Sequence, residues 1–402
     1  MMTFPPGLRA LNHDEFRRFY VAQLVAQVGS WIQAVAQSWL VLQLTGSPLR
    51  LGLISTLQFA PVLLFSVVVG AAADRLPKRR VLIASQTTFL CQALALALLV
   101  WTGAAQYWQV CALALVLGFA NVVDQPVRQS YIVEMVGRED LGNAIALNSA
   151  SFNTARIVGP AVAGVLIARF GLAPAFGLNA LGFAAVIYVL TRLRAHGLPA
   201  AKTGRTMLEE IGDGLRYALR TPRILVVLAL LTVVSLCVFN FTVYVPLLAR
   251  DVLGLGAEGF GFLMASLGVG AVAGALTVGA GRQPSLGGVF AIAAVSLAGL
   301  LGLSAARHFW MAAPLLFVTG FFGIMVMASC NARLQSEAPG DLRGRVMGIY
   351  VLLSGGVFPI GAFLVGAISE RWGVSTAFFC GGAGGLTALA AIGFAWRLRR
   401  SR

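Results

Sequence analysis

The feature that most constrains this chain is a series of twelve apolar runs, each about as long as a membrane-spanning helix. They fall at residues 16–43, 49–71, 80–101, 107–128, 142–168, 174–191, 223–249, 258–280, 285–304, 310–332, 344–369 and 375–395. A run of about 20 apolar residues crosses the hydrocarbon core of a bilayer as one helix. The runs do not alternate between polar and apolar residues as barrel strands would, and lipid-exposed backbone must be helix or closed barrel. The sequence therefore predicts an all-α integral membrane protein with twelve transmembrane helices.

Composition supports this fold class and argues against several functions. The chain of 402 residues is 58% hydrophobic and 11% charged with 46 glycines, which is typical of packed transmembrane helices. In a soluble protein a net charge of +15 would suggest a nucleic-acid partner. Here the Lys and Arg residues follow membrane topology, and we expect no nucleic-acid partner. The five cysteines lie within apolar runs, and the three histidines lie in loops or tails. With no phosphate-binding loop or catalytic triad spacing, we expect no enzyme activity, no cofactor and no metal site.

The distribution of basic residues predicts the orientation. Most of the 30 Lys and Arg residues fall on the side of the membrane that also holds both termini. The exceptions are Arg50, Arg169, Arg250, Arg307 and Arg371 in the opposite loops, and Arg156 within a span. Because positive loops stay in the cytoplasm, both termini are predicted to be cytoplasmic. The N-terminal residues do not read as a cleaved signal peptide, so we expect a multi-pass protein of the plasma membrane, the inner membrane of a bacterium.

A hydrophilic segment and an internal repeat divide the chain into halves. We expect a six-helix bundle at residues 1–191, a cytoplasmic linker at 192–222 and a second bundle at 223–402. Within the linker, Leu208, Ile211, Leu215 and Leu219 form one helical stripe, as in a helix lying on the inner leaflet, with a role as a tether or in regulation. ARFGLAPAF at 168–176 aligns with ERWGVSTAF at 370–378, and the same offset places Gly159 on Gly361.

Three segments carry a family resemblance. GAAADRLPKRR, at residues 70–80, resembles the loop between the second and third helices of the major facilitator superfamily of secondary transporters, although Pro77 replaces the more usual Gly. The PVRQSYIVEMV and RIVGPAVAG segments are similar to those of its twelve-helix exporters of drugs, macrolides and siderophores, such as the enterobactin and macrolide exporters. The resemblance implies two six-helix bundles in parallel repeat, with a substrate path at their interface.

The function implied is export of a small amphipathic molecule by alternating access, with protons as the coupling ion, by a monomer in the lipid bilayer. Two other interpretations stay open. The same fold could move a lipid or lysolipid, or the chain could be a membrane sensor or assembly factor that kept the fold and lost transport.

The loop at residues 70–80 also predicts a conformational latch. Gly70 permits a close helix contact, and Asp74 stands where its carboxylate can meet the positive N-terminus of a helix from the other half. That helix is expected to begin near Asp341. The latch would comprise Gly70, Asp74, Arg75, Arg79, Arg343 and Arg345. A cluster of positive charge that only sets topology is the alternative.

Polar residues within the spans are candidates for the substrate and proton pathway. Gln23, Gln27, Ser30 and Gln37 share one face of the first helix, which predicts either a water-filled cavity or interhelical hydrogen bonds.

Asp124 is the one acid within a span, and Asn121 and Arg128 lie near it on the same helix. Because an acid inside the membrane is costly, Asp124 predicts a proton site, an anchor for a cationic substrate, or a structural ion pair with Arg128 or Arg156. Arg156 could itself bind an anionic substrate or pair with Asp124.

The fifth helix carries small residues every four positions. Ser151, Ala155, Gly159 and Ala163 are joined there by Pro160 and Gly164. This pattern resembles the Gly-Pro motif of the superfamily's antiporters, and it is also what a close packing interface with a kink at the proline would need.

Overall fold

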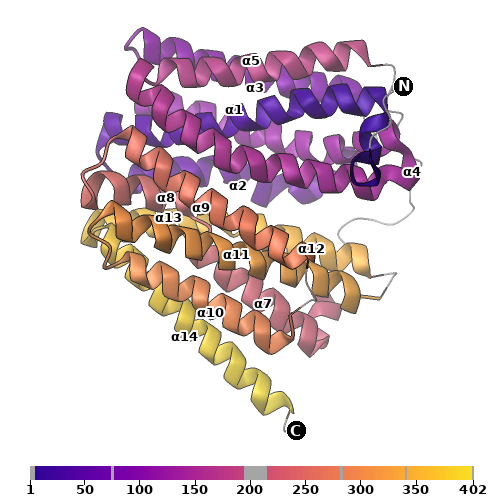
Figure 1. Cartoon of the computed structure of the whole chain (residues 1–402), viewed down its shortest axis with the longest axis vertical. Helices are drawn as coiled ribbons and strands as arrows, with labels where there is room; N and C mark the ends of the chain where they lie inside the picture. The colour runs from indigo at the N-terminus through magenta and orange to yellow at the C-terminus, as the bar shows by residue number, and fades with distance from the viewer. Residues whose placement is uncertain (1–4, 74–76, 194–214, 281–283, 340–341, 401–402) are drawn as a thin grey trace. The chain divides into compact units, whose positions relative to one another are not determined.

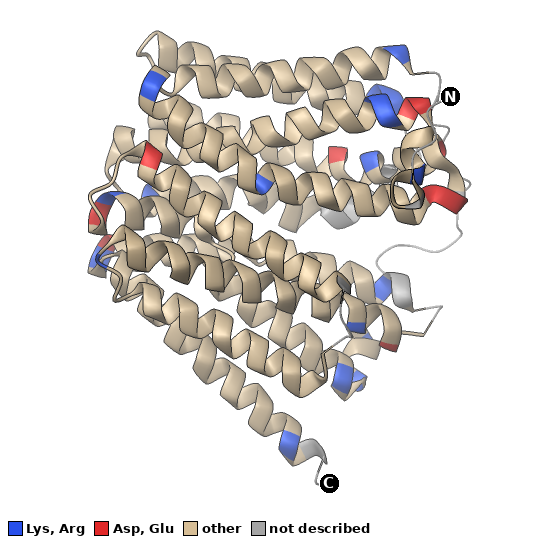
Figure 2. Ribbon diagram, in the orientation of Figure 1, with Lys and Arg blue, Asp and Glu red and all other residues tan. Residues whose placement is uncertain are grey.

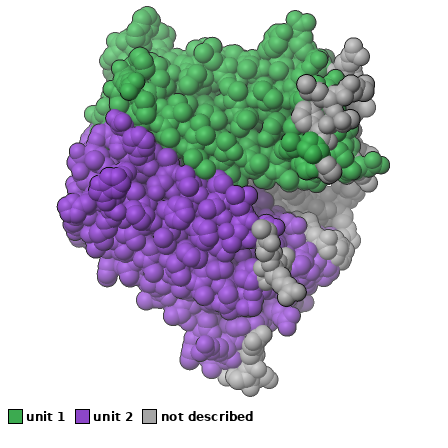
Figure 3. All heavy atoms as spheres, in the orientation of Figure 1, with its two compact units in different colours: residues 1–44, 60–203 green, residues 45–59, 204–402 purple. Residues whose placement is uncertain are grey.

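A computed structural model describes residues 5–73, 77–193, 215–280, 284–339 and 342–400 (Figure 1). Over these ranges every regular element is a helix. The chain forms two compact units, residues 1–44 with 60–203 and residues 45–59 with 204–402 (Figure 3). Residues 45–59, which include the first part of the second predicted helix, therefore group with the C-terminal unit, whereas the sequence placed the whole of residues 1–191 together. Of the predicted linker at 192–222, residues 194–214 lie outside the described residues.

Unit 1 is built from helices that pack along their lengths. Its elements are η1 (Pro6–Asn12), α1 (Asp14–Thr45), the later part of α2 (Pro48–Ala73), α3 (Lys78–Trp101), α4 (Tyr107–Phe170) and α5 (Ala173–Arg192). The label α4 covers two membrane spans, Tyr107–Gly137 and Glu139–Phe170. They are separated at Gly137, where φ is +70° and only glycine avoids strain. We call these spans α4a and α4b.

Unit 2 contains the early part of α2 and the remaining elements. These are α7 (Pro222–Cys237), α8 (Phe241–Leu247), η2 (Leu248–Val252), α9 (Ala257–Ala280), α10 (Leu286–Leu303), α11 (Phe309–Glu337), α12 (Arg343–Gly355), α13 (Phe358–Trp372) and α14 (Val374–Arg400). The apolar runs at 223–249 and 344–369 were each predicted as one helix, and both are interrupted. The first interruption includes Asn240, which precedes α8, and the second includes Gly356, which follows α12. A polar side chain or a glycine weakens a continuous helix at such a position.

The helices fit a membrane. Eleven spans among the described residues are long and apolar enough to cross one. The 32-residue helix α1 is also long enough, but its glutamines lower its hydropathy. Charged residues gather near the helix ends (Figure 2). Four exposed tryptophans lie in the first or last turn of their helices, as in the aromatic belt of a membrane protein: Trp101, Trp108, Trp310 and Trp372. The expected all-α membrane fold is confirmed.

The internal repeat has a structural counterpart. Gly171 ends α4b with φ +80°, and Gly373 ends α13 with φ +81°. Each backbone N–H bonds to the carbonyl four residues earlier. Both positions need a left-handed backbone, which explains why the two aligned segments share a glycine.

Small residues set the closest helix contacts in unit 2. A Cβ atom added to Gly270 or Gly274 of α9 would lie only 2.1 or 2.2 Å from the carbonyl oxygen of Phe317 or Phe321 of α11. One added to Gly320 of α11 would lie 2.3 Å from the carbonyl oxygen of Leu267. The backbones of α9 and α11 therefore approach as closely as glycine permits, which increases van der Waals contact inside a membrane.

Candidate functional site

The carboxylate of Asp124 is at the centre of a buried polar cluster between α3 and α4a. Its side chain is 1% exposed. The Oδ1 atom accepts hydrogen bonds from Ser85 Oγ at 2.8 Å and Gln86 Nε2 at 2.9 Å. The Oδ2 atom lies 3.4 Å from Arg128 Nε, one turn further along the same helix. The sequence offered Arg128 and Arg156 as partners, and the structure pairs Asp124 with Arg128.

The two carboxylate oxygens of Asp124 have different surroundings. Two hydrogen bonds hold Oδ1, whereas the partner of Oδ2 among the described residues is the Arg128 guanidinium at 3.4 Å. Asn121 does not join the cluster through its amide N–H, because Asn121 Nδ2 donates to the carbonyl of Leu117 in its own helix at 2.9 Å.

A second polar cluster links three helices of unit 1, and the sequence analysis missed it. Gln33 Nε2 of α1 donates to Gln92 Oε1 of α3 at 2.9 Å, and Asn179 Nδ2 of α5 donates to Gln33 Oε1 at 2.9 Å. All three side chains are at least 95% buried. The available signal was the presence of amide side chains within each of three apolar runs. Helical periodicity within one run does not say which amides of different helices meet.

The predicted glutamine stripe of α1 does not act as one surface. Ser30 Oγ bonds to the carbonyl of Ala26 in the same helix at 2.8 Å. Gln37 is 5% exposed and Gln23 is also 5% exposed. The Oε1 atoms of Gln23 and Gln27 are buried and accept no hydrogen bond from any described residue. These two oxygens therefore lack donors, whereas both ends of the Gln33 amide are hydrogen-bonded.

Arg156 lies in α4b with part of its guanidinium buried. Its Nε and Nη2 atoms are inaccessible and have no hydrogen-bond partner in the described part of the chain. The side chain as a whole is only partly buried. Asp124, the acid that the sequence suggested for it, is bonded to Ser85, Gln86 and Arg128 instead.

The small residues of α4b form a packing interface with α1. A Cβ atom on Gly159 would lie 2.4 Å from Trp31 Cβ and 3.0 Å from the carbonyl oxygen of Val28. Pro160 and Gly164 are buried beside it. The backbone stays helical through Pro160, because Gly137 alone in α4 has non-helical dihedral angles. This contact fits the packing interpretation of the motif, and a role in antiport stays a prediction.

The predicted latch falls largely outside the described residues. This holds for Asp74, Arg75 and Asp341, and nothing is described for the side chains at Gly70 and Arg343. Arg79 is described, and it binds the C-terminal end of α5. Its Nε donates to the carbonyl of Leu190 at 2.7 Å, and its Nη2 donates to the carbonyl of Thr191 at 2.6 Å. Arg345 is described in α12 and is half-buried.

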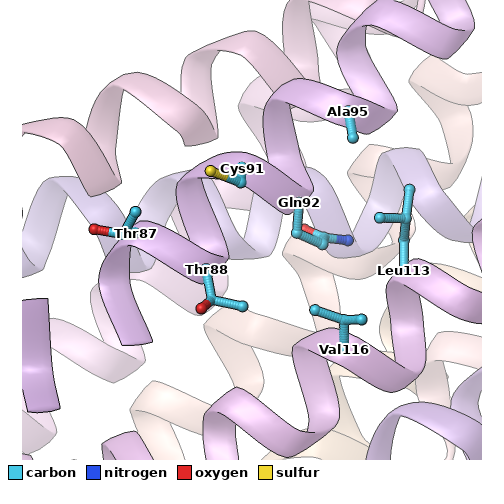
Figure 4. A pocket seen from close by; sticks show the side chains of 7 residues that line it. All are labelled: Thr87, Thr88, Cys91, Gln92, Ala95, Leu113 and Val116. Carbon is cyan, nitrogen blue, oxygen red and sulfur yellow. The ribbon is translucent and has the colours of Figure 1, made fainter. Parts of the chain in front are cut away.

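A cleft of about 400 Å³ lies between α3 and α4a (Figure 4). Its lining is mostly apolar and comprises Thr87, Thr88, Cys91, Gln92, Ala95, Leu113 and Val116. The amide end of Gln92 points toward Leu113 in this view, and its Nε2 atom is buried without a partner. Gln92 thus borders both the cleft and the second polar cluster. Within the described ranges, no three His, Cys, Asp or Glu side chains gather as metal ligands would.

Comparison with known proteins gives a consistent set of similarities. The model of the transmembrane secretion effector family matches residues 6–402. The chain is 29% identical to the multidrug efflux pump Tap of Mycolicibacterium fortuitum over 377 residues, which cover 89% of this chain and 90% of that protein. It is 23% identical to the staphyloferrin A transporter of Staphylococcus aureus over 378 residues, 90% and 91% of the two chains.

Among solved structures, the chain is similar to a bacterial homologue of the human lysosomal transporter Spinster in an inward-facing and occupied conformation. The TM-score is 0.75 at 12% identity, and the alignment covers 95% of this chain and 96% of the other. At this identity the likeness establishes the fold.

Proposed function

Because the chain belongs to the transmembrane secretion effector family, whose members are transporters of the major facilitator superfamily, we propose that it exports small amphipathic molecules in exchange for protons. The chain is a secondary transporter and a multi-pass membrane protein, and the family expected from the sequence is confirmed. The proposal concerns the substrate class and the coupling ion. Relatives named as a multidrug efflux pump and a siderophore transporter support the class of drug-like or siderophore-like molecules.

Asp124 carries the proposal of proton coupling. It is the one acid that the sequence places inside a span, and its carboxylate is 1% exposed. It lies 13 residues before the end of the 31-residue span α4a, so about 20 Å of helix separates it from that end. An acid inside a membrane span, with one cationic contact at 3.4 Å, is by default a candidate for a functional site, here the coupling site. The neutral form would release Arg128, which gives protonation a structural consequence.

The test separates coupling from binding. Purified protein is reconstituted in liposomes, and transport of a panel of amphipathic dyes is measured under an imposed pH gradient and as exchange without a gradient. Asp124→Asn should abolish gradient-driven transport and retain exchange, because the amide imitates the protonated acid and keeps the contacts of Ser85 and Gln86 within reach.

Glu258→Gln is the matched control, because it removes an exposed carboxylate near the start of α9 and should change neither activity. If Asp124 serves only as a structural ion pair, Asp124→Asn should fold poorly and lose exchange as well. Gradient-driven transport at the wild-type rate in Asp124→Asn would remove this residue from the mechanism.

We further propose that the protein is a monomer of the bacterial inner membrane with both termini in the cytoplasm. The distribution of Lys and Arg supports this orientation. The relatives are bacterial proteins, which supports the assignment to the bacterial inner membrane.

A further inference from the structure

Unit 1 contains a group of buried polar atoms that match one another in chemistry but are not bonded to any described residue. Gln23 Oε1 and Gln27 Oε1 are acceptors without donors, and Arg156 Nε and Nη2 are donors without acceptors. Buried polar groups are almost always hydrogen-bonded, because the desolvation cost is otherwise not offset. Three such side chains in adjoining helices indicate a site that a ligand completes.

The packing of α1 against α4b places these side chains at similar heights. Asn143 Oδ1 accepts from the backbone N–H of Ala10, 133 residues earlier, and Asp140 Oδ2 bonds to His13 Nε2, 127 residues earlier. At the other end of this contact, Gly159 packs on Val28. Ala10 and His13 come directly before α1, so these contacts place the start of α1 beside the start of α4b, and the two helices run parallel. This alignment brings Arg156 to the level of Gln27, with Gln23 about one helical turn before it.

Depth excludes the lipid headgroup as the missing partner. Arg156 lies near the middle of the 32-residue span Glu139–Phe170. At about 1.5 Å per residue, either end of the span is about 20 Å or more away along the helix. Because the hydrocarbon core is about 30 Å thick, headgroup phosphates lie beyond the reach of this side chain. An anion at this depth must therefore enter as a solute.

The protein supplies no anion of its own to Arg156 in the part that is described. Asp124 uses both carboxylate oxygens on Ser85, Gln86 and Arg128. A guanidinium that is buried in a membrane without a counter-charge is costly, and its planar array of donors fits a carboxylate. The remainder of the Arg156 side chain is partly exposed, which leaves a route for a ligand to reach it.

We propose that Arg156 binds an anionic group of the transported molecule, a carboxylate or its equivalent, and that Gln27 accepts a hydrogen bond from an N–H or O–H beside that anion. Gln23 offers a second acceptor one turn away. This inference rests on the proposed function and narrows its substrate class to amphipathic acids that carry a neighbouring hydrogen-bond donor.

The test uses three small fluorescent probes that differ by one group each. Dansylglycine carries a carboxylate and a neighbouring sulfonamide N–H, its methyl ester lacks the charge, and dansylsarcosine lacks the N–H. Binding is measured by fluorescence to the full-length protein in lipid nanodiscs. Wild-type protein should bind dansylglycine at least tenfold more tightly than the ester, and several-fold more tightly than dansylsarcosine.

Variants assign these preferences to residues. Arg156→Gln should weaken binding of the acid alone, so that the preference for acid over ester falls to less than twofold. Gln27→Leu should remove the preference for dansylglycine over dansylsarcosine. Arg169→Gln removes an exposed arginine from the same helix and should keep both preferences. Arg156→Lys keeps the charge and should retain part of the acid preference. It therefore tests the role of the charge even if Arg156→Gln misfolds.

Equal binding of acid and ester by wild-type protein, binding of neither, or an acid preference that survives in Arg156→Gln would overturn the inference. Gradient-driven transport of the ester in liposomes is measured in parallel. If the ester is transported and the acid is not preferred, the inference fails while the proposed exporter function stands.

Discussion

Adding a single methyl group at Gly270 should separate two helices of unit 2. The Cβ atom of Gly270→Ala would lie 2.1 Å from the carbonyl oxygen of Phe317, whereas ordinary contact begins at 3.4 Å. Relief requires a displacement of about 1.3 Å, and the neighbour is backbone that cannot rotate away. Overpacking of this kind costs about 1–3 kcal/mol.

Gly279→Ala, in the same helix, is the matched control. Outside the backbone of its own helix, no described residue lies within 4 Å of an added Cβ atom at Gly279. Alanine is the better helix former by up to about 1 kcal/mol, so this variant should be neutral or slightly more stable.

Stability is measured as the melting temperature of each purified variant in detergent, followed by tryptophan fluorescence. Gly270→Ala should melt at a lower temperature than wild type, and Gly279→Ala at the same temperature or a higher one. Equal shifts for both variants would show that helix propensity, rather than the close approach of α9 and α11, determines the effect.

Three further predictions address the network, a helix cap and topology. Asn179→Leu leaves Gln33 Oε1 without its donor and should lower the unfolding free energy by about 0.6–2 kcal/mol, measured by denaturant titration; an unchanged midpoint would contradict the bond. Glu370 Oε2 accepts hydrogen bonds from Ser47 Oγ at 2.8 Å and from the backbone N–H of Leu49 at 3.0 Å, and so caps the start of α2. Glu370→Gln should therefore lower the unfolding free energy by about 0.5–1 kcal/mol, seen as a reduced melting temperature. A melting temperature equal to wild type would argue against this cap. In a variant without native cysteines, a cysteine replacing Arg307 should react with an impermeant reagent on intact cells and one replacing Lys202 should not; the reverse pattern would invert the proposed orientation.

The membrane helices could be predicted because apolar runs report the part of each helix inside hydrocarbon. The helices extend past those runs where polar residues continue the same backbone outside it. For example, α1 begins at Asp14 and ends at Thr45, whereas the run covers 16–43. The residues between the fourth and fifth runs are also helical apart from the break at Gly137, because amphipathic ends lower hydropathy without ending the helix.

The polar contacts could be predicted only in part. Asp124 and Arg128 are one turn apart on one helix, so the sequence alone could suggest their ion pair. The bonds from Ser85 and Gln86 join different helices, and those between Gln33, Gln92 and Asn179 do also. Such pairings depend on which helix faces oppose each other, and spacing within one helix does not contain that information.

The central claim is that substrate movement and proton movement are coupled through Asp124. It is tested most directly by recording the internal pH of liposomes that contain the purified protein and the pH-sensitive dye pyranine, with no gradient imposed. When the best-transported dye of the panel is added outside, its entry should drive protons out and raise the internal pH with wild-type protein. Asp124→Asn should exchange the dye without a change in pH. If the wild-type protein admits the dye while the internal pH stays constant, proton-coupled export is contradicted.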